Sequence, residues 1–283
     1  MNGIINIYKD AGMTSHDVVN KIRRIAGIKK VGHTGTLDPD AKGVLPVCIG
    51  KATRVCDMLT SSDKRYTALL RLGITTDTQD IGGKVLVSRT VDVTDERISE
   101  VIGAFKGDIF QIPPMYSAIK VKGKKLYEYA REGVEIKRPP RKVTIYEINM
   151  LAREGNDIRL DIKCSKGTYI RTLCHDIGER LGCGGCMADL IRTQTSVFTL
   201  ENAQRLETIE KFGIEKYLIP VDELFDYEKV TVSGDKEKMI LNGASVYVGA
   251  DEGKYYRVYG SDGRFLCISK GLQGKLKLVK SFY

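Results

Sequence analysis

Apolar positions along residues 1–218 follow two different periods, which together predict a mixture of strands and helices. The strands expected from apolar runs or from alternation cover residues 3–8, 44–49, 64–72 and 158–164. Apolar residues three and four positions apart predict helices that begin at Ser15, Asp95 and Ile170, and a fourth helix over residues 207–218. Ser15 is expected to cap the first helix, and Gly107 to stop the second.

The pattern changes near residue 220. Residues 220–225 have the character of a linker, and after Val230 the chain shows short strands separated by glycine turns. Ser261-Asp262-Gly263 between two apolar runs is typical of a β-hairpin. These features predict a larger domain over residues 1–225 and a smaller, mostly β domain over residues 226–283.

The charge of the chain favours a polyanionic partner. Lys and Arg number 45 against 36 Asp and Glu, a formal charge of +9, and cations that neutralise phosphates release condensed counterions. Because an ordinary basic surface would give the same net charge, the positions of the basic residues along the chain carry more information than their number. Basic residues form an early cluster and a mid-chain cluster that also holds tyrosines: Lys21, Arg23, Arg24, Lys29 and Lys30, then Lys120, Lys122, Lys124, Lys125, Arg131, Lys137, Arg138, Arg141 and Lys142, with Tyr116, Tyr127 and Tyr129.

The sequence predicts neither a membrane span nor a secretory signal. No apolar run approaches the roughly 20 residues that cross a bilayer. Residues 1–25 carry four basic residues around a short apolar strand, without the apolar block and cleavage site of a signal peptide. We therefore expect a cytoplasmic location.

Seven cysteines at irregular spacing indicate reduced thiols rather than a disulfide framework. Cys183 and Cys186 form a Cys-x-x-Cys pair, and Cys174 and His175 could complete a zinc site, although this spacing fits no common zinc module. The alternative is a tight glycine-rich turn whose thiols pack as small hydrophobes. We favour the turn and expect no bound metal.

Candidate chemistry lies in residues 31–46, which have no periodicity and combine glycines, prolines, a histidine and carboxylates. Asp38 stands before Pro39, and the residue types alone favour a turn role, in which its side chain bonds nearby backbone amides, over a catalytic one. His33 is equally open, because a lone histidine often only satisfies local hydrogen bonds. The stretch Gly32-His33-Thr34-Gly35 also fits the Gly-x-x-Gly clamp of KH modules, but its flanking elements do not suit that fold.

The same segment, followed to Arg54, closely resembles the signature of the TruB family of tRNA pseudouridine synthases. The matching stretches cover nearly all of residues 3–200 in order: Lys9 with Gly12-Met13-Thr14-Ser15, Gly32-His33-Thr34-Gly35-Thr36-Leu37-Asp38-Pro39, Gly43-Val44-Leu45-Pro46, Gly50-Lys51-Ala52-Thr53-Arg54, Lys64-Arg65-Tyr66, Gln111-Ile112-Pro113-Pro114-Met115-Tyr116-Ser117-Ala118 and Lys166-Gly167-Thr168-Tyr169-Ile170-Arg171. One departure is Lys9-Asp10, where the family commonly has Lys-Pro, which affects the shape of that loop.

The resemblance implies isomerisation of a uridine in RNA to pseudouridine, in this family typically uridine 55 in the T loop of tRNA, without cofactor or metal. Asp38 matches the catalytic aspartate. Cleavage of the glycosidic bond develops positive charge at C1′. A carboxylate can stabilise this charge, can attack C1′, or can remove the 2′ proton on a route through a glycal. The residues leave these routes open.

Five further positions match family site residues, although each has an ordinary structural reading on its own. Tyr66 would stack on the target base and serve in the proton transfer from C5, and Arg171 would pair with Asp38. Tyr169 and Leu190 would line the uracil pocket, and His33 would fill the space of the flipped base. Lys9 is also expected to contribute to substrate binding.

The resemblance further implies an α+β pseudouridine synthase fold, with a mixed, mainly antiparallel sheet and flanking helices, and a PUA-like C-terminal domain. The basic insertion at about residues 108–142 would grip the tRNA arm through phosphate contacts and stacking. We expect a monomer that needs no protein partner. The alternatives are an RNA-binding protein without catalysis and a guide-dependent relative that acts on ribosomal RNA.

Overall fold

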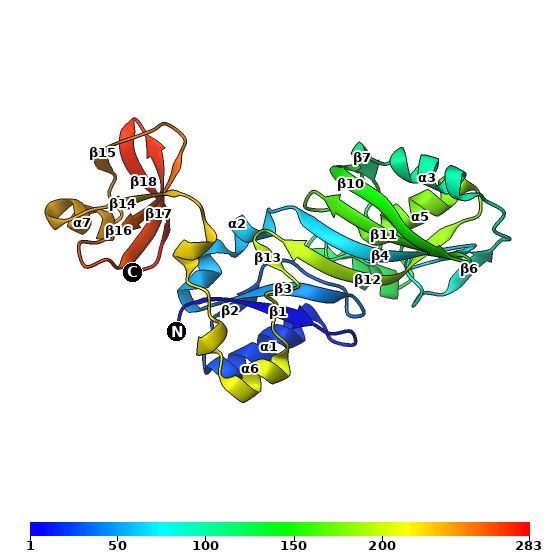
Figure 1. Cartoon of the computed structure of the whole chain (residues 1–283), viewed down its shortest axis with the longest axis horizontal. Coiled ribbons are helices and arrows are strands. Elements are labelled where there is room, and N and C mark those ends of the chain that lie inside the picture. The colour runs from blue at the N-terminus through cyan, green and yellow to red at the C-terminus, as the bar shows by residue number, and fades with distance from the viewer.

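The computed structural model describes residues 1–283 and has two main sheets, a large one in the N-terminal part and a smaller one at the C-terminus (Figure 1). The large sheet has nine strands in the order β1-β3-β12-β4-β11-β10-β7, with β2 paired to β3 and β13 to β12. Its strands are β1 (Gly3–Lys9), β2 (Val31–His33), β3 (Lys42–Ile49), β4 (Lys64–Leu72), β7 (Gly107–Gln111), β10 (Arg141–Glu154), β11 (Asp157–Cys164), β12 (Gly185–Thr195) and β13 (Phe198–Thr199).

Helices and short hairpins complete the fold, and the last α-helix lies beside the C-terminal sheet (Figure 1). The α-helices are α1 (Ser15–Ala26), α2 (Cys56–Thr60), α3 (Asp95–Gly103), α4 (Leu126–Arg131), α5 (Ile170–Leu181), α6 (Leu206–Phe212) and α7 (Gly234–Leu241). Three 3₁₀ turns are η1 (Gly50–Val55), η2 (Glu215–Tyr217) and η3 (Val221–Leu224), and two small hairpins pair β5 (Ile74–Thr76) with β6 (Val85–Ser88) and β8 (Lys120–Val121) with β9 (Lys124–Lys125). No helix has the length and apolar content needed to cross a membrane.

The large sheet is joined at one narrow point. Strands β3 and β12 run parallel and share only two residue pairs, Ile191 with Lys42 and Arg192 with Gly43, whereas the other strand pairs of this sheet are antiparallel. Gly43 has φ +103°, and a Cβ atom there would lie 2.2 Å from the carbonyl oxygen of Arg192. Glycine at this position therefore permits the two backbones to approach.

The four predicted strands are confirmed, and the predicted helices need three corrections. Thr14, not Ser15, caps α1, because its hydroxyl accepts the Asp17 amide in a capping box. The expected helix over 207–218 ends at Phe212, where Gly213 has φ +85°, and the chain continues as the turn η2. Helix α3 ends at Gly103, so Gly107 begins a strand instead of stopping the helix.

The C-terminal sheet has five strands in the order β14-β16-β17-β18-β15. They are β14 (Glu228–Thr231), β15 (Val246–Ala250), β16 (Tyr255–Tyr259), β17 (Phe265–Leu272) and β18 (Gly274–Ser281), and β16 with β17 forms the predicted hairpin. Its core cluster is separate from the 35-residue cluster under the large sheet. A third cluster connects the two parts, since Ile268 packs with Val221, Leu224 and Phe198. The observed fold is thus α+β with a mostly β C-terminal part, as predicted.

Candidate active site

Arg171, in the first turn of α5, lies at the centre of the candidate site. Its Nε atom lies 3.0 Å from Oδ2 of Asp38, and its Nη2 atom donates to Oδ1 at 3.4 Å. The same guanidinium donates to the carbonyl oxygens of Thr78 at 3.1 Å and Tyr116 at 2.9 Å. The arginine side chain is 7 % exposed and the Asp38 side chain 42 %. A buried, fully engaged guanidinium therefore holds a carboxylate that remains open to solvent.

The loop that carries Asp38 is fastened on both sides of that residue. The Ser15 hydroxyl donates to the Leu37 carbonyl and accepts the Leu37 amide at 2.9 Å. Lys9, which is fully buried, donates through Nζ to the carbonyl oxygens of Asp10, Met13 and Pro39 at 2.7 to 2.9 Å. These contacts fix the loop against β1 and α1.

Lys9 is predicted to contribute to substrate binding, and in the structure its ammonium contacts the backbone of the Asp38 loop and its neighbours. Its ammonium has three donors, and three backbone carbonyls occupy them. Burial lowers its pKa to about 8 against the opposing charges of Asp40 and Asp38. With no donor left for a substrate, Lys9 supports the Asp38 loop.

Tyr66 lies on β4 as the cross-strand partner of Arg192 on β12. The tyrosine is 8 % exposed, and burial raises the pKa of its phenol to about 12, while Arg192 opposes the rise. Arg192 itself is buried and donates from Nε to the Val44 carbonyl at 2.7 Å and from Nη2 to the Gly35 carbonyl at 3.1 Å. Burial lowers the pKa of Arg192.

The other expected residues lie around this centre. Tyr169 immediately precedes α5. Its backbone N–H donates to Oε1 of the Gln111 side chain at 3.0 Å, and its carbonyl oxygen accepts from Nε2 of the same side chain at 3.2 Å. Leu190 is a buried residue of β12 opposite Ala68. The Nδ1 atom of His33 accepts the Gly35 amide at 3.2 Å, so the neutral ring carries its proton on Nε2. Burial and Arg192 lower the pKa of His33.

Two residues of the site were not found from the sequence. Asp80 places Oδ2 3.6 Å from Nη1 of Arg171, so a second carboxylate shares the guanidinium with Asp38. The available signal was the polar, aperiodic stretch over residues 77–83 between two short strands. For Arg192 the signal was a charged residue at a buried position of a strand pattern.

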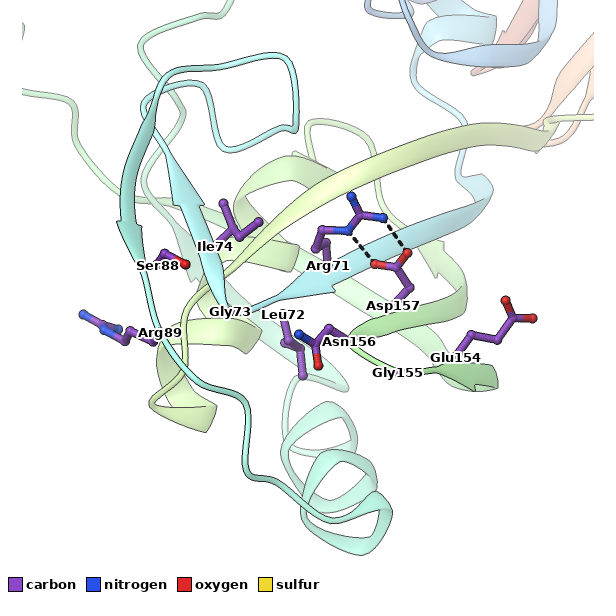
Figure 2. Close-up of a pocket in the computed structure, with 10 residues that line it drawn as sticks. All are labelled: Arg71, Leu72, Gly73, Ile74, Ser88, Arg89, Glu154, Gly155, Asn156 and Asp157. Atoms are coloured by element: carbon purple, nitrogen blue, oxygen red, sulfur yellow. Dashed lines mark hydrogen bonds and ion pairs between the residues drawn. The ribbon is translucent and has the colours of Figure 1, made fainter.

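The site offers no ligand set for a metal. No group of three or more His, Cys, Asp or Glu side chains is placed to hold an ion. Cys183 and Cys186 are buried free thiols, which fits the glycine-turn interpretation. A polar hollow of about 500 Å³ lies at the ends of β4 and β10, and Asp38 is not among the residues that line it (Figure 2). Arg71 forms a bidentate pair with Asp157 there at 2.7 and 2.6 Å, so its charge is already neutralised.

The basic insertion lies beside Arg171, because Tyr116 at its base accepts a hydrogen bond from that guanidinium. Within it, Lys124 lies over the Tyr129 ring, and Lys125 and Arg131 lie over the Tyr127 ring. Lys120 and Lys122 are exposed and form no ion pair. The insertion therefore carries cations and aromatic rings on a segment that contacts, through Tyr116, the arginine that holds Asp38.

Comparisons with known proteins agree with the sequence motifs. The family model described as "TruB family pseudouridylate synthase (N terminal domain)" matches residues 23–170, and "tRNA pseudouridylate synthase B C-terminal domain" matches residues 171–226. The chain is 50 % identical to "tRNA pseudouridine synthase B" of Clostridium novyi (strain NT), over 96 % of this chain and 98 % of the relative. It is 47 % identical to the protein of that name from Clostridium perfringens (strain 13 / Type A), over 99 % and 98 %.

Solved structures show the same fold. One titled "Crystal Structure of a Cbf5-Nop10-Gar1 Complex" contains a chain that is 29 % identical, with a TM-score of 0.76 over 99 % of this chain and 85 % of that one. Another, titled "Structure of H/ACA RNP bound to a substrate RNA containing 2'-deoxyuridine", matches with a TM-score of 0.74 and 27 % identity over 99 % and 85 %.

Proposed function

Because this chain belongs to the TruB family of pseudouridylate synthases, we propose that it converts uridine 55 in the T loop of tRNA to pseudouridine. Isomerisation of uridine in tRNA follows from the family and from the relatives' names, while the position is our inference from the resemblance. The observation that carries the proposal is the Asp38–Arg171 pair, a solvent-accessible carboxylate held at both oxygens by a buried guanidinium.

The chemistry assigns Asp38 to the sugar. Breaking the bond between C1′ and N1 leaves positive charge at C1′ and negative charge on the uracil. The carboxylate either adds to C1′ or removes the neighbouring 2′ proton, and both actions require it ionised and correctly oriented. Arg171 keeps Asp38 ionised and oriented, and Asp80 contacts the same guanidinium and so helps to hold Arg171 in place.

Tyr66 acts on the base after the uracil has turned and C5 has bonded to C1′. Its ring stacks on the uracil, and its phenolic oxygen, after releasing its own proton to solvent, receives the C5 proton. The electron pair of the C5–H bond closes the C5=C6 double bond, the C6=N1 pair moves to N1, and N1 takes a proton from solvent. Tyr169 and Leu190 line the pocket, and His33 fills the stack that the flipped base leaves.

We assign the tRNA arm to the basic insertion at about residues 108–142 and a second RNA contact to a PUA-like domain over residues 226–283. Exposed Lys120 and Lys122 and the stacked pairs on Tyr127 and Tyr129 fit phosphate and base contacts. Helix–strand packing around Ile268 joins the two domains.

The test is release of tritium from a tRNA transcript labelled at uridine C5, with purified protein and no guide RNA or partner protein. We expect release by the wild type, placed at position 55 by mapping the product, and none by Asp38→Asn, with tRNA affinity unchanged. Asp40→Asn is the matched control, because Asp40 lies on the same loop and forms no ion pair with Arg171. No release by the wild type would refute the proposal, and release from another position would refute the site.

A further inference from the structure

Arg192 is a buried cation that the proposed chemistry does not use. Its side chain is 1 % exposed, yet no carboxylate pairs with it. Its hydrogen-bond acceptors are the carbonyl oxygens of Val44 and Gly35, which engage Nε and Nη2 and leave Nη1 without a carbonyl partner. A buried charge without a counter-ion is expensive to maintain, so its presence suggests an anion that forms only during the reaction.

The strand register brings Arg192 to Tyr66. The two residues are direct cross-strand partners on β12 and β4, so their side chains leave the same face of the sheet. Burial raises the pKa of the Tyr66 phenol to about 12, and the nearby positive charge of Arg192 opposes this rise. Nη1 also lies beside the loop before Asp38, 3.5 Å from where a Cβ atom of Gly35 would be. One side chain thus connects Tyr66, β3 and the catalytic loop.

The other groups that face the phenol do not favour its anion. They are the Cys164 thiol from β11 and the Asp38 carboxylate, and both raise the pKa of Tyr66. Lys64, two residues earlier on β4, donates instead to the carbonyl oxygens of Thr60 and Ser62. Arg192 is therefore the group in this set that can stabilise a phenolate.

We propose that Arg192 is a positioning residue for Tyr66: its guanidinium fixes the phenol against the Gly35 loop and stabilises the phenolate that receives the C5 proton. This inference rests on the proposed function. The phenol first loses its proton to solvent, the phenolate then takes the proton from C5, and the C5–H electron pair enters the ring. Arg192 itself neither gives nor takes a proton.

The experiment separates this step from the earlier bond breaking by using two tRNA transcripts under single-turnover conditions. One carries tritium at uridine C5, and the other carries 5-fluorouridine, which has no C5 proton to lose. For Arg192→Met we expect tritium release at neutral pH to slow by about tenfold or more, since one pKa unit is a tenfold change in phenolate population. Rearrangement of 5-fluorouridine should stay close to the wild-type rate, and the deficit in tritium release should shrink as the pH rises.

Two further variants keep the test decisive. Arg192→Lys retains a positive charge, so it should recover part of the tritium release even where Arg192→Met folds poorly. Arg71→Met is the matched control, because Arg71 also lies on the large sheet but pairs with Asp157 in the hollow of Figure 2. Equal slowing of both transcripts by both Arg192 variants, or no slowing of either, would overturn the inference. Absence of tritium release by the wild type would instead overturn the proposed function.

Discussion

Gly43 should not tolerate a side chain, because it lies where β3 meets β12. In Gly43→Ala the new Cβ atom would lie 2.2 Å from the Arg192 carbonyl oxygen, about 1.2 Å inside the 3.4 Å at which ordinary contact begins. The residue also has φ +103°, a conformation that costs alanine about 1–3 kcal/mol. Overpacking against a backbone that cannot rotate away adds about 3 kcal/mol or more. We expect a total loss of about 4–6 kcal/mol in the free energy of unfolding.

Gly107→Ala is the matched control for this prediction. Gly107 has φ +102°, but no atom lies within 4 Å of its ideal Cβ position. It should therefore lose only the conformational contribution, about 1–3 kcal/mol. The assay is urea unfolding followed by circular dichroism, because the chain has no tryptophan. If the two variants lose the same stability within about 0.5 kcal/mol, the close approach of β3 and β12 contributes nothing and the reasoning fails.

Three further predictions concern charge. Arg171→Met should lower the single-turnover rate by about 100-fold or more while tRNA affinity is retained, because Asp38 loses the group that holds both its oxygens; a rate within tenfold of wild type would contradict this. Burial raises the pKa of Asp176, so this carboxyl binds a proton more readily in the folded protein than in the unfolded chain. Its contribution to the free energy of unfolding is therefore present at low pH and is lost as the pH rises. Asp176→Asn should therefore be more stable than wild type at pH 7 in urea unfolding, and this gain should vanish below pH 3.8. The Lys120→Ala/Lys122→Ala double variant should weaken tRNA binding and reduce the slope of log affinity against log salt by about two, whereas Lys142→Ala, which removes a cation already paired with a carboxylate, should change that slope less.

The strands were predictable because alternation is a local property. In β4 the observed burial alternates at every residue from Lys64 to Leu72, and the sequence shows the same period. The helix over 207–218 was overextended because its spacing continued past Gly213, whose positive φ in an extended conformation ends α6. A local conformational preference there overrides the periodicity.

The contact between Asp38 and Arg171 was predictable only through the resemblance. Asp38 and Arg171 are 133 residues apart, and nothing in the spacing brings them together. Ser15 illustrates the same limit, since its position suggested a helix cap while its hydroxyl in fact holds the Leu37 backbone. Asp80 and Arg192 were missed because their roles arise from neighbours that only the folded sheet supplies.

Because β3 and β12 share only two residue pairs, the large sheet cannot be completed during synthesis until β12 has been made. The loop that carries Asp38 emerges from the ribosome early, but the strand that joins it to Tyr66 extends to Thr195. Until that strand has left the exit tunnel, Asp38 has neither Arg171 nor the β4 half of the sheet in place. A nascent chain truncated before Thr195 thus lacks the β3–β12 junction, and we expect it to be unable to carry out the proposed reaction.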